Sequence, residues 1–213
     1  MTKQVDLTEQ LPLIAIIRGV TPDNVIDVAG ILIEEGFTMI EVPLNSPDPL
    51  TSIRALVKEF GSEYLIGAGT VTTPELAAKV IDTGANLVVT PNCDPKVISM
   101  CVNAGCATFP GVATPTEAFT AISAGATDLK LFPVSMFGIE GMKALKSVLP
   151  NDIKLYPVGG INPSIESMQP YIKAGAAGFG LGSALFKSSM SLDEIRKSAR
   201  SFVHNFRECV NNH

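Results

Sequence analysis

The sequence predicts an α/β fold: a single (β/α)8 TIM barrel domain over residues 1–213, with a short N-terminal helix over residues 1–10. Three observations predict it, namely eight short apolar runs, helical stretches between them, and helix start and stop signals at a near-constant period. A chain of 213 residues, 46% of them hydrophobic, can bury one sizeable core. An open doubly wound sheet is the alternative, but the first expected loop, "IIRGVTPDN", lacks the glycine fingerprint usual in that fold.

The eight apolar runs have the length of buried strands. Their spacing of roughly 20 to 25 residues leaves room for one helix after each strand, as in consecutive parallel βα units. The runs cover residues 12–18, 38–44, 64–70, 86–91, 106–111, 128–133, 153–160 and 177–183. We therefore expect parallel strands with helices on their outer side.

The expected helices begin and end at recognisable residues. A residue that can cap a helix precedes a proline at five places, and residues 191–194, "SLDE", match a capping box. Glycine follows six expected helix ends. The caps are Thr21, Thr73, Asp94, Thr114 and Asn162, and the glycines are Gly36, Gly61, Gly84, Gly105, Gly125 and Gly175.

The charge of the chain argues against polyanionic partners. A net charge of -5 and a pI near 5.1 provide no long-range field for nucleic acid or an anionic membrane. The apolar run that ends at Arg18 spans only about seven residues, too few for a membrane span or a signal peptide. We expect a cytoplasmic protein that needs a local site to bind an anionic ligand.

The sequence predicts neither a metal site nor a cofactor. The two histidines, His204 and His213, lie close to the C-terminal end and cannot join the upstream cysteines in a metal site. The cysteines show no CxxC spacing and occur in apolar segments, as reduced core residues do. They are Cys93, Cys101, Cys106 and Cys209.

Lys130 is the first candidate catalytic residue. In "ATDLKLFPVSMFG" (126–138) it interrupts an apolar run, and strand alternation puts it on one face with Asp128 and Phe132. Alternatively, Lys130 could lie on an exposed edge strand and have no chemical role, but a closed barrel has no edge strand. Burial and a nearby cation such as Arg18 would lower the pKa of the lysine, and a neutral amine can form a Schiff base with a ketone.

Glu41 is the second candidate. It lies among Met39, Ile40 and Val42, in a strand whose outer face helices would cover, so we expect it to point inward. A carboxyl group in a partly dry site can shuttle protons. The alternative is that Glu41 forms a structural ion pair with Lys130, which only fills the centre of the barrel.

The ends of the other expected strands supply the rest of the pocket, because barrel sites form at the carboxyl ends of the strands. Glycine-rich turns after the last two strands can hold a phosphate through backbone N–H groups, although such turns are also ordinary barrel corners. These candidates are Arg18, Thr70, Thr90, Pro91, Asn92, Pro110, Gly111, Phe132, Gly159, Gly160, Gly182 and Ser183.

Six motifs closely resemble the 2-keto-3-deoxy-6-phosphogluconate and -6-phosphogalactonate aldolases. They are "EVPLNSP" (41–47), "IGAGTV" (66–71), "VTPN" (89–92), "FPGVATPTEAFTAISAGATDLKLFPVSMFG" (109–138), "VGGINP" (158–163) and "GLGS" (180–183). The resemblance implies a homotrimer without metal that cleaves a phosphorylated 2-keto-3-deoxy sugar acid. It extends over almost the whole chain from Leu11 onward.

The resemblance also implies roles for individual residues. Lys130 would be the Schiff-base lysine and Glu41 the general acid and base. Thr70 and Arg18 would contact the pyruvate carboxylate. The phosphate would lie against Gly159, Gly160, Gly182 and Ser183, and the walls of the site would be Pro91 and Phe132.

Two features resemble the phosphogalactonate branch, and a third position departs from the phosphogluconate branch. Asn45 stands where the phosphogluconate branch usually has an arginine, Arg18 belongs to an "RG" that the latter usually lacks, and Val158 replaces a common threonine. Asn45 and Val158 are therefore expected to contact the substrate hydroxyls. The resemblance implies cleavage of the phosphogalactonate to pyruvate and D-glyceraldehyde 3-phosphate.

Other functions remain open at this point. One is cleavage of the phosphogluconate, or of both sugars. Another is a phosphate-binding barrel that isomerises or condenses phosphorylated metabolites, with Glu41 as base and Lys130 as a fixed cation. A third is an inactive barrel that serves as a binding or assembly module. Only the aldolases would form a covalent adduct with pyruvate on Lys130.

Overall fold

The structure is a computed structural model that describes residue 7 and residues 10–212. The helix expected over residues 1–10 falls mostly on residues outside this description. The strands are β1 (Leu13–Ile16), β2 (Met39–Pro43), β3 (Leu65–Gly69), β4 (Leu87–Val89), β5 (Ala107–Phe109), β6 (Gly111–Val112), β7 (Asp128–Leu131), β8 (Lys154–Pro157) and β9 (Phe179–Leu181). The α-helices are α1 (Val25–Glu34), α2 (Pro49–Phe60), α3 (Pro74–Ile81), α4 (Pro95–Asn103), α5 (Pro115–Ser123), α6 (Gly138–Lys146), α7 (Ile165–Lys173) and α8 (Leu192–Asn211), and a short 3-10 helix, η2 (Val134–Met136), precedes α6.

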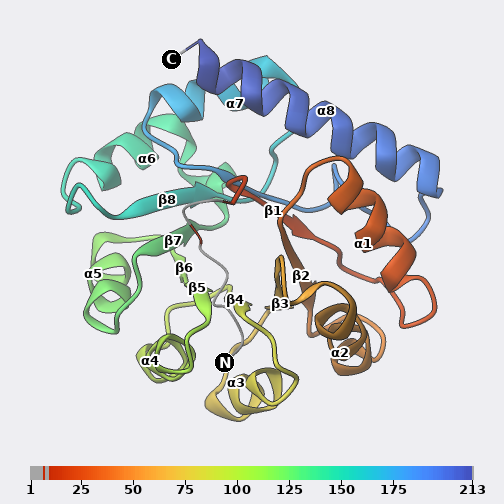
Figure 1. Cartoon of the computed structure of the whole chain (residues 1–213). Coiled ribbons are helices and arrows are strands. Elements are labelled where there is room, and N and C mark those ends of the chain that lie inside the picture. Colours follow the sequence, from red (N-terminus) through yellow and green to blue (C-terminus); the bar gives the residue numbers. More distant parts are fainter. Residues whose placement is uncertain (1–6, 8–9, 213) are drawn as a thin grey trace.

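Parallel strands occupy the centre of the molecule and the helices lie around them (Figure 1). Six strands form one sheet in the order β5-β4-β3-β2-β1-β9, and three form a second in the order β6-β7-β8. An isolated parallel bridge joins Val158, just after β8, to Gly180 in β9. The predicted α/β architecture, with helices outside parallel strands, is confirmed.

The fifth apolar run differs from the single strand that the sequence predicts. It divides at Pro110 into β5, which pairs with β4, and β6, which pairs with β7. Proline has no N–H to donate to a ladder, so pairing changes partner there. The Pro110 carbonyl accepts a hydrogen bond from the Lys130 N–H at 2.9 Å, and the Thr90 hydroxyl accepts one from the Gly111 N–H at 3.2 Å.

Three of the five predicted proline-linked caps are confirmed. The side chains of Thr73, Asp94 and Thr114 accept hydrogen bonds from the first turns of α3, α4 and α5, and a proline opens each helix. The predicted capping box is confirmed at α8, where Ser191 and Glu194 bond reciprocally.

The other two predicted caps are wrong by two or three residues. α1 begins at Val25, because the Asn24 side chain accepts hydrogen bonds from the N–H and hydroxyl of Thr21 and closes a turn ahead of the helix. α7 begins at Ile165, and its cap is Ser164, whose hydroxyl accepts a hydrogen bond from a first-turn N–H. The side chain of Asn162 therefore does not cap α7.

The apolar side chains separate into an inner and an outer cluster. The outer cluster fills the space between strands and helices, and alternate strand residues face the other way. The inner cluster is closed by an edge-to-face pair, Phe109 and Tyr156, with ring centroids 5.0 Å apart. Its buried members are Ile14, Met39, Leu65, Leu87, Val89, Phe109 and Tyr156. Any strand residue in phase with these therefore points into the interior.

The long helix α8 packs across α1 and α7, at the top of Figure 1. Arg196 lies 2.7 Å from Glu34, and Arg200 lies 2.8 Å from Glu35, which fastens α8 to the end of α1. Because α1 and α8 follow β1 and β9, which pair with each other, this contact holds the first and last βα units together.

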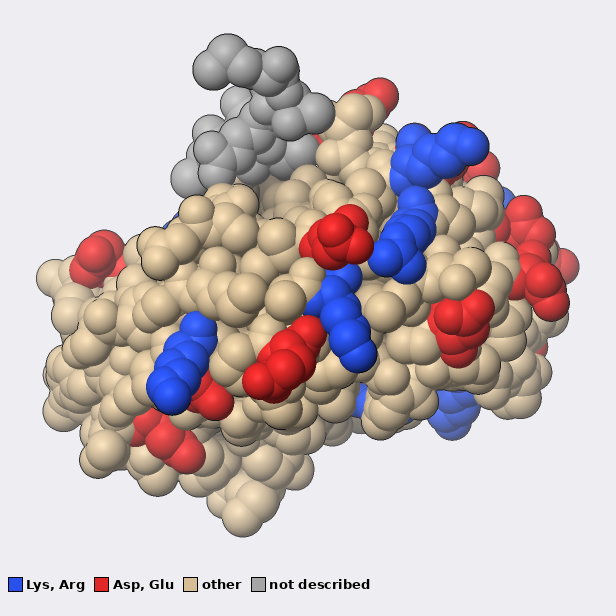
Figure 2. Space-filling view, turned by 90° about the horizontal axis from the view of Figure 1, so that it is seen from below, with Lys and Arg blue, Asp and Glu red and all other residues tan. Residues whose placement is uncertain are grey.

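Positive and negative side chains are mixed on the face shown in Figure 2, as expected for a chain without a polyanion-binding field. All four cysteines are free, and three of them are buried, as predicted. No helix in the described part of the chain is both long and apolar enough to cross a bilayer.

Candidate active site

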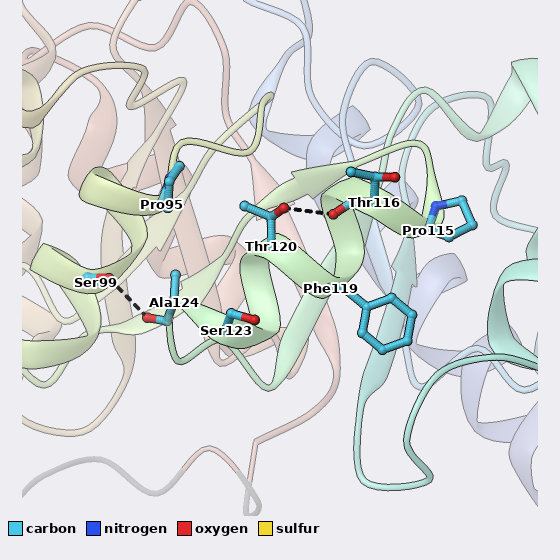
Figure 3. A pocket seen from close by; sticks show the side chains of 8 residues that line it. All are labelled: Pro95, Ser99, Pro115, Thr116, Phe119, Thr120, Ser123 and Ala124. Atoms are coloured by element: carbon cyan, nitrogen blue, oxygen red, sulfur yellow. Dashed lines mark hydrogen bonds between the residues drawn. The ribbon is translucent and has the colours of Figure 1, made fainter.

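Two cavities differ in whether ionisable side chains line them. The larger, about 650 Å³, lies on the outside between α4 and α5, where Phe119 is 44% exposed (Figure 3). None of the side chains that line it titrates; they are Pro95, Ser99, Pro115, Thr116, Phe119, Thr120, Ser123 and Ala124. The second cavity, of about 400 Å³, lies at the carboxyl ends of the strands and contains Lys130 and Arg18. The second cavity is therefore the candidate site.

Ten of the residues predicted for the site line this cavity. They are Arg18, Thr70, Pro91, Lys130, Phe132, Val158, Gly159, Gly160, Gly182 and Ser183. Glu41 and Asn45 do not line it: Glu41 is buried in the interior, and Asn45 contacts Arg18 from the adjacent loop. Thr90, Asn92, Pro110 and Gly111 are not among the lining residues either.

Lys130 enters the interior from β7. It stands opposite Tyr156 of the inner cluster, and residues paired in this way face the same side of a sheet. The side chain is buried, with 7% of its surface exposed, and its Nζ lies 4.7 Å from the centre of the Phe132 ring. Desolvation by burial, with a smaller contribution from the Arg18 charge, lowers the pKa of Lys130, and Glu41 opposes this. A larger fraction of the amine is therefore neutral and nucleophilic.

Glu41 enters the same interior from β2, in phase with Met39 of the inner cluster. Only 2% of its surface is exposed, and burial raises its pKa to about 7, although Lys130 and Arg18 both act to lower it. Among the described residues its Oε2 atom has no hydrogen-bond partner. A carboxyl group that titrates near neutrality can both accept and donate a proton.

The structure can be compared with the alternative in which Glu41 and Lys130 form a structural ion pair. Lys130 and Glu41 influence each other electrostatically, yet they form no salt bridge within residues 10–212. A paired buried carboxylate would have its oxygens saturated. The unpartnered Oε2 favours a group that is ready to exchange a proton with a ligand.

Arg18 is held at the mouth of the cavity by the loop after β2. Its Nη1 donates a hydrogen bond to the Asn45 side-chain oxygen, and the neighbouring Gly19 N–H donates to the Ser46 hydroxyl at 3.0 Å. Asn45, which was expected to contact the substrate, is exposed in this loop and contacts Arg18. Its contact with substrate stays a prediction.

Thr70 follows β3 with a φ of 61°, in the left-handed region that a threonine rarely adopts. Such backbone strain is often found at ligand sites, where surrounding structure holds it in place. The residue lines the cavity beside Lys130 and Arg18.

The glycine-rich turns after β8 and β9 also line the cavity. Gly159 and Gly160 have φ values of 104° and 77°, which require glycine. A β-carbon at Gly160 or Gly182 would meet nothing within 4 Å, so their backbone is open to a ligand. Ser183 adds an exposed hydroxyl.

Several residues around these turns were missed by the sequence reasoning. Lys187 and Ser188 add a third cation and a further hydroxyl to the lining, and they lie only a few residues beyond the "GLGS" motif. Asn162, which was predicted to cap α7, lines the cavity as well. The others are Ile16, Ile161, Gly180, Ala184 and Phe186.

Comparisons with known proteins identify the family of the chain. The family model described as KDPG and KHG aldolase matches residues 5–198. A 2-dehydro-3-deoxy-6-phosphogalactonate aldolase from Escherichia coli (strain K12) is 48% identical over 201 residues, which cover 94% of this chain and 97% of the relative.

Two solved structures are similar to this chain over most of its length. The first, described as "Native KDPGal structure", is 48% identical with a TM-score of 0.92 and covers 94% of this chain and 97% of that one. The second, a protein cage "designed by fusing symmetric oligomeric domains", is 47% identical with a TM-score of 0.92 and covers 95% of this chain and 74% of that one. The family model, the relative and a cavity with a buried lysine lead to one conclusion: this chain belongs to the KDPG and KHG aldolase family.

Proposed function

We propose that this aldolase cleaves 2-dehydro-3-deoxy-6-phosphogalactonate to pyruvate and D-glyceraldehyde 3-phosphate through a Schiff base on Lys130. The observation that carries the proposal is the buried Lys130 amine, whose pKa is lowered, in a cavity next to a carboxyl group whose pKa is about 7. The substrate follows from the 48% identical relative and from the residues at positions 45 and 158.

The reaction begins at the ketone of the substrate. The neutral Nζ of Lys130 attacks C2, and the carbinolamine loses water to give an iminium ion. The positive nitrogen then provides the electron sink for bond cleavage, which is why this reaction calls on neither a metal nor a cofactor.

Cleavage follows from removal of one proton. Glu41, directly or through a water molecule, takes the proton of the C4 hydroxyl, the C3–C4 bond breaks, and its electron pair moves to the iminium nitrogen. Glyceraldehyde 3-phosphate leaves, and a pyruvate enamine remains on Lys130. Protonation of its C3 carbon by Glu41, followed by hydrolysis, releases pyruvate and the free lysine.

The polar groups of the cavity suit the two charged ends of the substrate. Arg18 and Thr70 line the cavity and are proposed to bind the carboxylate. Backbone N–H groups at Gly159, Gly160 and Gly182, with the Ser183 hydroxyl, are proposed to bind the phosphate. Pro91 and Phe132 would form the apolar walls between them.

We further propose that the two sheets close into one (β/α)8 barrel and that residues 1–213 form a single domain. The Val158–Gly180 bridge and the continuity of the chain through Pro110 support closure. A homotrimer is proposed from the family resemblance, and the likeness to a cage built from symmetric oligomeric domains supports an oligomer. A cytoplasmic location stays a prediction from the sequence.

Trapping the Schiff base tests the proposal. The protein is incubated with pyruvate and sodium borohydride, and its peptides are then analysed by mass spectrometry. We expect a reduced pyruvyl group on Lys130 and none in a Lys130→Arg variant, because a guanidinium cannot form the imine. Cleavage without this adduct would refute the mechanism and favour Lys130 as a fixed cation.

The same preparation tests the substrate. Pyruvate release from the phosphogalactonate and from the phosphogluconate is measured at several concentrations to obtain both kcat/KM values. A higher value for the phosphogalactonate is expected. A clear preference for the phosphogluconate would favour the alternative substrate, and release from neither would favour a binding module.

A further inference from the structure

Gly69, the last residue of β3, lies directly against the side chain of Glu41. A β-carbon built on Gly69 would be 2.0 Å from Glu41 Oε2, 2.3 Å from its Cδ and 2.4 Å from its Oε1. All three of the nearest atoms thus belong to one carboxyl group. The carboxyl group of Glu41 occupies the space in which any other amino acid at position 69 would place its side chain.

The backbone does not account for a glycine at this position. The φ of Gly69 lies outside the left-handed region, whereas Gly159 and Gly160 have φ values of 104° and 77°. An L-residue could therefore adopt the backbone conformation of Gly69 without strain. The Glu41 carboxyl is the nearest obstacle to a side chain at this position.

The register of β2 and β3 shows which way the Glu41 side chain leans. Glu41 stands opposite Gly67, and Gly69 stands opposite Pro43, two residues nearer the carboxyl end of the sheet. A β-carbon on Gly67 would meet the Leu87 backbone at 1.7 Å rather than Glu41. The carboxyl group therefore leans from its own strand position toward the end of the sheet at which the cavity lies.

We propose that Gly69 is a positioning residue that holds the Glu41 carboxyl at the cavity end of the interior, where it can reach the substrate bound to Lys130. The proposal rests on the proposed acid and base role of Glu41. A β-carbon essentially never approaches a neighbouring atom to within 3.0 Å, so Gly69→Ala must displace the carboxyl by about 1 Å. A displacement of that size at a reacting group costs on the order of 10²-fold in rate.

The experiment compares Gly69→Ala with a matched control, Gly30→Ala. Gly30 lies in α1, and a β-carbon there meets nothing within 4 Å, so this change tests glycine replacement alone. We expect Gly69→Ala to lower kcat about 10²-fold and to leave KM within about threefold, while pyruvate is still trapped on Lys130. Gly30→Ala should keep the wild-type kcat. Turnover of Gly69→Ala close to that of the wild type would overturn the proposal.

A second comparison separates the placement of Glu41 from a general loss of stability. Glu41→Ala removes the carboxyl, so the added methyl group of Gly69→Ala then has room. We expect Gly69→Ala to lower the thermal unfolding midpoint of the wild type and to leave that of Glu41→Ala unchanged. Equal lowering in both backgrounds would overturn the proposal, even where Gly69→Ala by itself folds poorly.

The outcomes distinguish this inference from the proposed function. An inactive Glu41→Gln together with a fully active Gly69→Ala would refute only the role of Gly69. A fully active Glu41→Gln would refute the acid and base role, and with it the effect expected on kcat. Trapping of pyruvate on Lys130 tests the Schiff base independently of both.

Discussion

The side chains of Glu41 on β2 and Lys130 on β7 enter the same interior, and the charge of each acts on the pKa of the other. Burial shifts the two groups in opposite directions, raising the pKa of the acid and lowering that of the amine. Both shifts favour the uncharged forms. The lysine is thereby made a better nucleophile, and the glutamate is brought to a pKa at which it can exchange protons.

Replacing Glu41 by glutamine should separate proton transfer from imine formation. The amide keeps the shape of the side chain and removes its titrating group, so we expect turnover to fall by about 10²-fold or more. Pyruvate should still be trapped on Lys130, although more weakly. The exposed Glu59 on α2 provides the control, since Glu59→Gln should keep wild-type turnover. Near-normal turnover of Glu41→Gln would show that another group moves the proton.

The same variant should change how stability depends on pH. The pKa of Glu41 rises from 4.5 to about 7 on folding, so the stability that this carboxyl contributes is fully present below pH 4.5 and is lost as the pH rises through 7. Glutamine does not titrate. The free energy of unfolding of Glu41→Gln, relative to wild type, should therefore increase between pH 5 and pH 8, by about 2.5 kcal/mol. A difference that stays constant over this range in urea unfolding would contradict the burial of an ionisable Glu41.

Asn45 should act on activity through Arg18. Asn45→Ala removes the side-chain oxygen that holds the guanidinium, so Arg18 would be free to leave the mouth of the cavity. We expect kcat/KM for the aldol substrate to fall about 10-fold, equivalent to about 1.4 kcal/mol. Asn151, exposed in the turn before β8, provides the matched control, because Asn151→Ala makes the same chemical change away from the cavity. An unchanged kcat/KM in Asn45→Ala would show that its contact with Arg18 does not matter for substrate binding.

Val158 should influence the choice between the two sugars, which differ in configuration at C4. It lines the cavity and its side chain offers no hydrogen bond, so a threonine at this position would add a polar partner for a substrate hydroxyl. We expect Val158→Thr to change the ratio of the two kcat/KM values by about 10- to 100-fold, so that the preference for the phosphogalactonate becomes smaller or reverses. This is the range expected for one hydrogen bond to the substrate, ~1 to 3 kcal/mol. Val148→Thr, at an exposed site, should leave the ratio alone. Equal losses for both sugars in Val158→Thr would refute this role.

Chelators should leave the rate unchanged. The Lys130 iminium supplies the electron sink that a divalent metal would otherwise provide. Turnover is measured before and after incubation with EDTA and gel filtration. Strong inhibition that added divalent metal reverses would indicate metal-assisted enolate chemistry instead.

Local patterns in the sequence predicted much of the architecture. Alternation of apolar residues predicted the strands and the inward face of Lys130, because one strand by itself determines which side chains share a face. Thr73, Asp94 and Thr114 predicted helix starts, since a cap needs only the first turn that follows it. The two caps that failed, Thr21 and Asn162, are followed by a second residue able to cap, and the sequence does not show which of the two the chain uses.

The family resemblance added the roles of the site residues, and ten of those named line one cavity. The positions of these residues in the sequence did not predict that Asn45 contacts Arg18, or that Lys187 lines the cavity. Such contacts depend on how loops after different strands fold over one end of the sheet.

The sequence by itself determined the strands, most helix starts and the burial of the two ionisable residues, all of which follow from the periodicity of neighbouring residues. Only the tertiary structure decided that the run around Pro110 pairs with two different strands and that Gly69 makes room for the Glu41 carboxyl. Gly69 and Glu41 are separated by a whole βα unit. Their contact is set by the register of β2 against β3, and no local pattern encodes the distance between side chains on two strands.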